Sequence, residues 1–350
     1  MANTAAVRVL VTGGAGYIGA VLCEHLLKAG HRPVVLDRFF WGRAPLEHLA
    51  VEAIAGDLRD IREEWLDGIE AVMHLGGLSN DPTAEYNTDA NWQMNAIATE
   101  KLVGLCKVRK IRRFTFASSA SVYDTESSAK ELERSPMMCD ETTALTPRGA
   151  YSISKVHAEK TILAAAGGDF APVIFRQGTV YGWSPRMRFD LVVNTFIKDA
   201  MINRRLFLHG GGWMWRPLVD VSDVARVHVM ALEVPLEKIA GQIFNVLEEN
   251  YQIRQLAMLV AGSFAIKDMH IDLVETPLPA LVRNYRMSNA KLSKAIGFTP
   301  SVSVLESIQA MIEKLPLAVE ELAHPQYYNI RWMTLLEEIH TSQRPFDSIY

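Results

Sequence analysis

Residues Val7–Gly19 read VRVLVTGGAGYIG and carry the strongest indication of the fold. The first half of this stretch is a short apolar, β-branched run that predicts a strand ending at Thr12, and Gly13–Gly19 predicts a tight turn. Apolar periodicity over Tyr17–Ala29 then predicts a helix, and a second apolar strand ends at Asp37. A strand, a glycine turn, a helix and a strand within about 30 residues form a βαβ unit.

The glycines of this stretch match the dinucleotide-binding pattern G-x-G-x-x-G, and Asp37 follows Gly19 by eighteen residues. In that pattern Gly14 permits the tight turn, Gly16 lets backbone N–H groups approach a pyrophosphate, and Gly19 lets helix and strand pack closely. A carboxylate at Asp37 binds ribose hydroxyls and repels a 2′-phosphate, which predicts NAD as the cofactor. The adjacent Arg38 could accept that phosphate, so NADP stays open.

Strands and helices alternate through the first half of the chain. Further strands are predicted at 51–55, 71–75, 113–117 and 172–175, and helices at 90–108 and 151–166. This order predicts an α/β protein with a Rossmann-type doubly wound parallel sheet that has helices on both faces. We expect residues 1–176 to form the NAD-binding domain, including the catalytic residues.

Residues 177–350 are predicted to be mainly a smaller C-terminal substrate-binding region with helices, and parts of it are expected to return to the sheet. Strand patterns become sparse beyond about residue 176. Helical periodicity reappears in the last 50 residues, over 302–315 and 330–339.

Composition restricts the possible partners. The 350 residues are 49% hydrophobic and 22% charged, with a formal net charge of -4, which is typical of a globular protein and gives no electrostatic footprint for nucleic acid. The short basic patch within 107–113 is typical of an exposed helix end. The three cysteines and ten histidines show no ligand spacing, so no metal is predicted. The apolar run near the start is too short to cross a membrane, and we expect a soluble, cytoplasmic protein.

A candidate catalytic set follows the strand at 113–117. Tyr151 and Lys155 stand at positions i and i+4, on one face of the predicted helix. An ammonium group beside a phenol favours phenolate, so Lys155 is expected to lower the pKa of Tyr151 and suit it for proton exchange with a sugar hydroxyl. Ser119, in the serine cluster after the strand, could hydrogen-bond the same reacting oxygen.

The order and spacing of several motifs resemble the extended short-chain dehydrogenases/reductases, the NAD-dependent nucleotide-sugar epimerase/dehydratase family. The resemblance covers residues 7 to about 300 and rests on VTGGAGYIG at 11–19, GDL at 56–58, HLGG at 74–77, SS at 118–119 with VY at 122–123, and YSISK at 151–155. It implies a catalytic Ser119, Tyr151 as the acid/base, and Lys155 that also binds the nicotinamide ribose. It also implies a homodimer.

The resemblance further implies cofactor and substrate contacts. The cofactor-binding residues would be Gly13, Gly16, Tyr17, Ile18, Asp37, Arg38, Asp57, Leu58, Leu75, Gly76, Gly77, Asn95, Tyr151 and Lys155. The partner would be a nucleotide-diphosphate sugar, bound by Ser79, Ser121, Thr179, Arg186, Arg216 and Arg283. Thr179 stands where the family usually has Asn. The planar guanidinium of Arg216 or Arg283 suits a diphosphate.

The reaction type follows from two positions in the serine cluster. The family's 4,6-dehydratases carry Asp-Glu directly before Val-Tyr, and its decarboxylases favour Glu at the second position, but here these residues are Ala120 and Ser121. Elimination and decarboxylation therefore lose support, which leaves epimerisation through a transient ketone, most often at C4, with the cofactor regenerated in each turnover. The alternatives are an NAD(P)-dependent ketoreductase or dehydrogenase acting on a similar sugar, and a non-catalytic binding member of the fold.

Overall fold

The computed structural model describes residues 6–123, 126–127, 136–278, 282–315 and 318–343. A seven-stranded sheet forms its centre, in the order β12-β8-β5-β4-β1-β2-β3, and every neighbouring pair in it is parallel. The strands are β1 (Arg8–Thr12), β2 (Arg32–Asp37), β3 (Glu52–Ala55), β4 (Ala71–His74), β5 (Arg113–Ser119), β8 (Ala171–Gln177) and β12 (Gln242–Val246). The predicted doubly wound α/β fold is confirmed.

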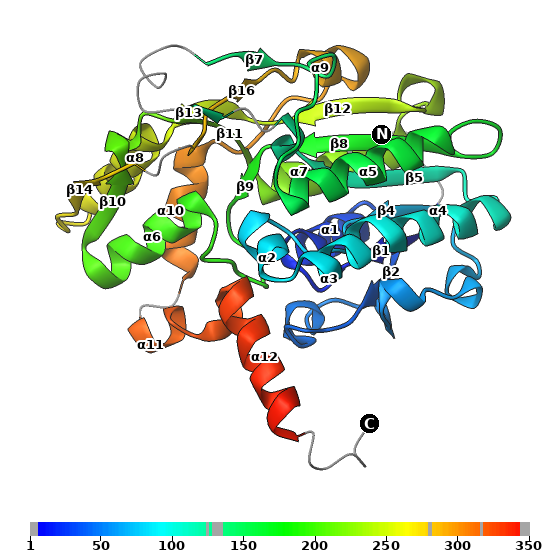
Figure 1. Cartoon of the computed structure of the whole chain (residues 1–350), viewed down its shortest axis with the longest axis horizontal. Coiled ribbons are helices and arrows are strands. Elements are labelled where there is room, and N and C mark those ends of the chain that lie inside the picture. Colours follow the sequence, from blue (N-terminus) through cyan, green and yellow to red (C-terminus); the bar gives the residue numbers. More distant parts are fainter. Residues whose placement is uncertain (1–5, 124–125, 128–135, 279–281, 316–317, 344–350) are drawn as a thin grey trace.

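Helices cover both faces of this sheet (Figure 1). Side chains alternate along β1: Val9 and Val11 pack in the same core cluster as α1 (Tyr17–Lys28) and part of α7 (Val221–Glu233). Leu10 points the other way and packs in the cluster that contains α4 (Ala98–Val108) and α5 (Ala150–Ala164). A strand buried on both faces reads as a continuous apolar run, which explains the VLV sequence.

The sheet reverses its strand order between β1 and β4. The chain runs outward from β1 through β2 to β3, and then crosses back to β4, β5, β8 and β12. Open α/β sheets bind ligands at the carboxyl ends of strands on either side of such a switch point. The glycine turn after β1 and the Gly76–Gly77 pair after β4 lie there, and Leu75 N donates to Thr12 O across the two strands.

The helix predicted over residues 90–108 is interrupted. It consists of α3 (Thr88–Trp92), a π-helical turn over Gln93–Ile97, and α4. A π-helical turn adds one residue to the hydrogen-bonded ring and changes which side chains face inward. Asn95, within this turn, is 2% exposed, and its side chain bonds to the Leu78 backbone after β4.

The sequence predicts few strands beyond residue 176, and this prediction is wrong. One small sheet contains β9 (Thr179–Tyr181), β11 (Trp215–Asp220) and β13 (Glu249–Gln252), and another pairs β10 (Arg205–His209) with β14 (Asp272–Thr276). Two-residue strands form the remaining pairs, β6 (Glu126–Ser127) with β15 (Val282–Arg283) and β7 (Met138–Cys139) with β16 (Arg286–Met287). Strands this short give almost no periodic signal.

The remaining helices are α2 (Asp81–Tyr86), near the site, and those of the second half of the chain. The latter are α6 (Val192–Asn203), α8 (Ile253–Ala265), α9 (Ala290–Ile296), α10 (Val304–Lys314), α11 (Val319–Leu322) and α12 (Asn329–Gln343). In Figure 1, α12 extends from the body close to α2, and Tyr86 of α2 donates a hydrogen bond to Glu337 of α12.

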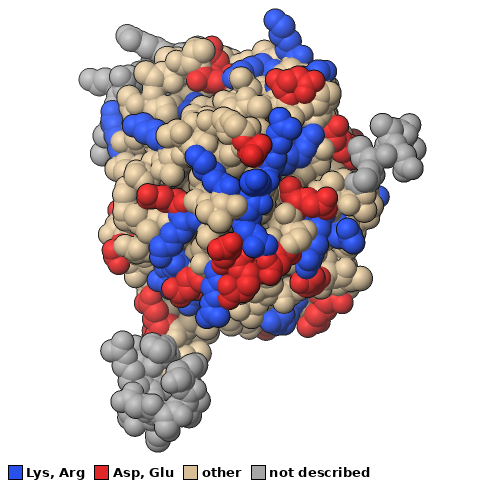
Figure 2. All heavy atoms as spheres, turned by 90° about the vertical axis from the view of Figure 1, so that its right-hand side faces the viewer, with Lys and Arg blue, Asp and Glu red and all other residues tan. Residues whose placement is uncertain are grey.

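Surface charge is mixed. On the face shown in Figure 2, Lys and Arg side chains are interspersed with Asp and Glu side chains. The basic patch at 107–113 lies at the end of α4, where Arg109 forms ion pairs with Glu63 and Asp67. This agrees with a helix-end role rather than a phosphate site. Within the described ranges, no helix combines the length and apolar character needed to cross a membrane.

Candidate active site

A cavity of about 370 Å³ opens at the carboxyl ends of the central strands. The predicted site residues that line it are Gly13, Gly16, Tyr17, Ile18, Asp37, Arg38, Leu58, Leu75, Gly76, Gly77, Ser79, Ser119, Ser121, Tyr151, Lys155, Thr179, Arg186, Arg216 and Arg283. Two predicted residues, Asp57 and Asn95, stand behind this lining. Segments from almost the whole chain therefore meet at one edge of the sheet.

The glycine turn is shaped by close contacts of its backbone. Gly13, rather than Gly14 as expected, has the left-handed backbone (φ +70°), and a Cβ there would lie 2.8 Å from Gly76 Cα. A Cβ on Gly14 would instead meet the Val35 side chain at 2.7 Å. A Cβ on Gly19 would lie 2.2 Å from Gly13 O, so α1 can approach the turn only without a side chain at this position.

The α1 N-terminus is open toward the cavity. Its N-cap, Gly16, makes no side-chain capping hydrogen bond. Unpaired N–H groups and the partial positive charge of a helix start favour an anion. Ala15 N and Phe39 N donate to the two carboxylate oxygens of Asp37 at 3.0 and 2.7 Å, which fixes Asp37 beside the turn. Burial raises the pKa of Asp37.

Arg38 is engaged within the protein. Its guanidinium forms an ion pair with Asp57 at 3.0 Å and stacks on the Phe40 ring at 4.1 Å. Asp57 also accepts a hydrogen bond from Arg59 Nη2 at 2.6 Å, and these arginines keep its pKa below the usual range although burial opposes them. Since Arg38 already has a carboxylate partner, this arrangement favours NAD over a phosphorylated cofactor.

Asn95 supports the wall of the cavity from behind. Its side chain accepts a hydrogen bond from Leu78 N and donates to Leu78 O, each at 2.8 Å. It also donates to Ser154 on α5 at 3.3 Å. Gly77 lies against this amide, with φ +151°, and a Cβ there would lie 2.3 Å from Asn95 Oδ1. Asn95 therefore fixes the backbone after β4 and does not reach the cavity itself.

The three candidate catalytic side chains meet at one wall. The Ser119 hydroxyl lies close enough to the Tyr151 phenol to lower its pKa, and Ser121 Oγ donates to Ser119 Oγ at 3.0 Å. Lys155 Nζ donates to Ala117 O at 2.9 Å and lies 5.8 Å from the centre of the Tyr151 ring. Strand β5 and helix α5 thus bring together residues more than thirty positions apart.

The pKa of Tyr151 moves in the direction opposite to the expectation. Burial, and secondarily the charge of Asp81, raise it to about 12, while the bond to Ser119 lowers it. Burial also lowers the pKa of Lys155 to about 8, and Glu159 opposes that shift. Desolvation outweighs the ammonium–phenol attraction because the Lys155 ammonium is directed at a backbone carbonyl.

The candidate substrate arginines differ in their partners. Arg283 forms a two-point ion pair with Asp81, with Nη2 2.7 Å from Oδ1. Arg216 donates to the backbone carbonyls of Trp215 and Arg283. Asp81, at the start of α2, was not predicted as a site residue, although its position after β4 is a signal that could have indicated it.

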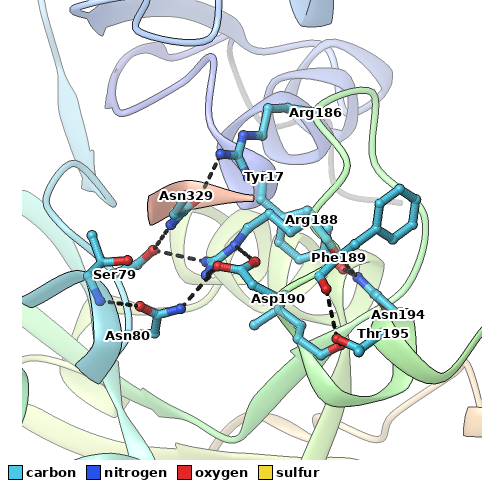
Figure 3. A network of polar contacts seen from close by, with 12 residues as sticks. Tyr17, Ser79, Asn80, Arg186, Arg188, Phe189, Asp190, Asn194, Thr195 and Asn329 are labelled. Atoms are coloured by element: carbon cyan, nitrogen blue, oxygen red, sulfur yellow. Dashed lines mark hydrogen bonds and ion pairs between the residues drawn. The ribbon is translucent and has the colours of Figure 1, made fainter. Parts of the chain in front are cut away.

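A polar network encloses the opposite wall (Figure 3). Arg188 forms a two-point ion pair with Asp190 and donates to Ser79 Oγ at 2.9 Å. The Tyr17 hydroxyl donates to Gly182 O at 2.6 Å, so its side chain joins α1 to the loop after β9. Asn194 holds that hydroxyl from the other side at 3.1 Å.

Arg186 and Asn329 complete this wall. Arg186 Nη2 donates to Asn329 Oδ1 at 2.6 Å. Asn329, together with Trp41, Asp81 and Tyr285, lines the cavity but was not predicted as a site residue. No local pattern marks Asn329, because it reaches the cavity only through the fold. Among the described residues, no group of three or more His, Cys, Asp or Glu side chains is arranged to hold a metal ion.

A dinucleotide fits this cavity on the evidence of its own residues. The uncapped α1 start offers N–H groups, and Asp37 offers a carboxylate. Buried donors nearby have no hydrogen-bond acceptor among the described residues, namely Nε and Nη1 of Arg186 and Nε1 of Trp41. Buried donors of this kind call for an acceptor such as a phosphate.

Comparison with known proteins identifies the family. The model of the NAD dependent epimerase/dehydratase family matches residues 9–246, more than half of the chain. The chain belongs to this family. The resemblance seen in the sequence is thereby confirmed, and membership of an NAD-dependent family makes NAD the cofactor.

Relatives in this family carry different activities. The chain is 26% identical to a UDP-glucose 4-epimerase of Corynebacterium glutamicum over 86% of its own length and 93% of the relative's. It is 27% identical to the UDP-glucuronic acid decarboxylase 1 of Danio rerio, over 91% of its own length and 75% of the relative's. Among solved structures, MoeE5 in complex with UDP-glucose and NAD matches with a TM-score of 0.74 and 25% identity, covering 87% of this chain and 97% of MoeE5.

Proposed function

We propose that the protein is an NAD-dependent nucleotide-sugar epimerase that acts at C4 through a transient keto-sugar. The observation that carries this proposal is the cavity wall formed by Ser119, Tyr151 and Lys155, next to Ala120 and Ser121. It offers a proton-exchanging phenol without an acid at either position that elimination or decarboxylation uses in the family.

Tyr151 would exchange the proton of the reacting hydroxyl, and Ser119 would hold that oxygen by a hydrogen bond. When bound, NAD supplies a positively charged hydride acceptor, and a positive charge in the same cavity favours the phenolate form of Tyr151. Lys155 is 5% exposed and bonded to Ala117 O, so it adds a fixed positive charge beside the phenol. The keto-sugar must then rotate within the cavity, so that the hydride returns to the opposite face of its carbonyl group.

The substrate class follows from the arginines and from the relatives. Arg216 and Arg283 line the cavity, and their planar groups suit a diphosphate. Ser79, Ser121 and Thr179 also line it and would contact the sugar nucleotide. Relatives named for UDP-glucose and UDP-glucuronic acid support a UDP-sugar.

A net dehydrogenase or ketoreductase on a similar sugar is the second candidate. The same three catalytic side chains serve both reactions, because each needs proton transfer at a carbinol oxygen. The difference is in the fate of the cofactor, which an epimerase restores in every turnover and a net redox enzyme consumes. We also propose a homodimer, as the family resemblance implies, and a cytoplasmic location.

The test uses the purified protein without added cofactor. UDP-glucose, UDP-N-acetylglucosamine and UDP-glucuronic acid are incubated separately, and NMR follows the sugar signals. An epimer formed without net reduction of NAD supports the proposal, whereas turnover only with added NAD or NADH, with a matching change in nicotinamide absorbance, moves it to the second candidate. A pentose product from UDP-glucuronic acid would overturn both in favour of decarboxylation.

A further inference from the structure

Arg186 is a buried cation that lacks a carboxylate partner. Arg186 is only 5% exposed, and its guanidinium forms no ion pair with any described residue. One N–H group is bonded to Asn329, but Nε and Nη1 have no acceptor within the described part of the chain. Its neighbour Arg188, in contrast, is neutralised by Asp190. A buried charge left in this state is costly unless an anion joins it.

The surroundings of Arg186 belong to the cofactor side of the cavity. Its guanidinium stacks on the Trp41 ring at 4.2 Å, and Trp41 follows Asp37 by four residues. The charges of Asp37 and Arg186 influence one another's pKa, which places both groups within electrostatic range. Trp41 Nε1 is also buried without an acceptor among the described residues. Arg216 and Arg283 instead lie with Tyr285 and Asp81.

A C-terminal segment fixes this arrangement. Asn329, the first residue of α12, is 3% exposed, accepts from Arg186, and lies with Nδ2 3.5 Å from Ser79 Oγ. Three residues later, Trp332 Nε1 donates to Phe40 O at 2.6 Å, in the loop that carries Trp41. The segment thus connects the loops after β2, β4 and β9 around one edge of the cavity. Figure 3 shows Asn329 between Arg186 and Ser79. It lies outside residues 9–246, which the family model matches.

We propose that Arg186, with Trp41, binds the diphosphate of NAD, and that Asn329 is a positioning residue that aims Arg186 at it. The C-terminal segment is then part of the cofactor site. Nε and Nη1 of Arg186 and Nε1 of Trp41 supply side-chain donors, whereas the glycine turn has only backbone N–H groups. Diphosphate oxygens are the acceptors that these side chains need. The proposal rests on NAD as the cofactor and holds whether the sugar reaction is an epimerisation or a net oxidation.

The experiment measures binding rather than turnover. Arg186→Met and Asn329→Ala are prepared with their NAD removed, and calorimetry gives the Kd of NAD and, separately, of UDP. Arg331→Met is the matched control, because Arg331 is exposed on the same helix two residues from Asn329 and stacks on Tyr328. We expect Arg186→Met to weaken NAD binding at least about tenfold and Asn329→Ala to weaken it by a smaller factor. UDP binding should stay within about twofold.

The outcomes separate the two sources of diphosphate. Weaker UDP binding with unchanged NAD binding would overturn the proposal and assign Arg186 to the sugar nucleotide. Unchanged affinity for both NAD and UDP would give Arg186 a purely structural role and would also overturn the proposal. Melting temperatures without NAD show whether each variant is folded. If Arg186→Met is unfolded, the NAD affinity of Asn329→Ala tests the proposal. Neither result depends on which sugar is converted.

Discussion

At the scale of single residues, the chemistry depends on how burial competes with charge. The sequence places Lys155 one helical turn from Tyr151, and proximity alone would lower the pKa of the phenol. In the structure, burial raises that pKa to about 12, so the phenol is protonated at neutral pH before a ligand contributes its charge. The same desolvation lowers the pKa of Lys155 to about 8.

Replacement of the phenol hydroxyl tests the role of Tyr151. We expect Tyr151→Phe to lower kcat by a factor of roughly 10² to 10⁴, because it removes the proton-exchanging group and keeps the ring. NAD content should stay near the wild-type value, as the change leaves the glycine turn and Asp37 intact. Turnover is measured by NMR and NAD by absorbance after denaturation. A variant with more than a tenth of wild-type activity would refute the role.

The buried ammonium of Lys155 predicts a pH dependence of stability. Its folded pKa of about 8 lies below the ordinary lysine value of 10.5. Between these values the unfolded chain binds a proton that the folded chain does not, so stability rises with pH in this window. We expect the melting temperature of the wild type, relative to Lys155→Met, to increase from pH 8 toward 10. A flat difference over that range would contradict the shift.

At the scale of elements, close backbone contact decides how the first helix meets the first strand. The glycine pattern was assigned correctly to a turn between β1 and α1, but the residue with left-handed backbone is Gly13 and not Gly14. Gly19 matters for a different reason, since α1 approaches the turn so closely that a Cβ there would overlap Gly13 O. Packing of helix on strand, and not turn geometry, requires this glycine.

Substitution of Gly19 tests that packing. We expect Gly19→Ala to reduce the free energy of unfolding by about 3 kcal/mol, because backbone must shift to admit the methyl group. Gly104→Ala is the control: Gly104 lies in α4, and a Cβ there would have no neighbour within 4 Å. It should raise stability by about 0.5–1 kcal/mol through helix propensity. Urea unfolding measures both, and equal effects would refute the argument.

At the scale of the whole molecule, the homodimer stays a prediction. The family resemblance implies contact through the long helices, and α4 and α5 are the long helices that cover one face of the sheet. Ile153 of α5 is 42% exposed and therefore lies on the outer side of the helices that cover this face.

The dimer prediction is tested by charge at that surface. We expect Ile153→Glu to convert a dimer into a monomer, because a carboxylate would be buried in the contact. Met258→Glu is the control, since Met258 is 58% exposed on α8. Light scattering at working concentration gives the mass of each protein. A monomeric wild type, or a dimer that survives Ile153→Glu, would contradict the prediction.

Local sequence patterns predicted the first half of the fold and many, though fewer than half, of the residues that line the cavity. The β1–α1–β2 unit, the central strands β3, β4, β5 and β8, and the candidate Ser-Tyr-Lys set were all predictable, because buried parallel strands, glycine turns and i, i+4 spacing are local patterns. Arg216 and Arg283 were located only by resemblance, and their partners, including Asp81, were not predictable.

The remaining features follow from long-range packing and are not visible in the local sequence. The two-residue strands β15 and β16 are too short to give a period, and the π-helical turn at 93–97 leaves no distinct pattern. Asn329 lies 250 residues from Ser79 in sequence, yet both meet at the same wall. Side-chain contacts across such separations, and the burial that sets the pKa values of Tyr151 and Lys155, arise only when the chain is packed. Local sequence carries propensity and period, whereas desolvation and long-range hydrogen bonds are properties of the folded molecule.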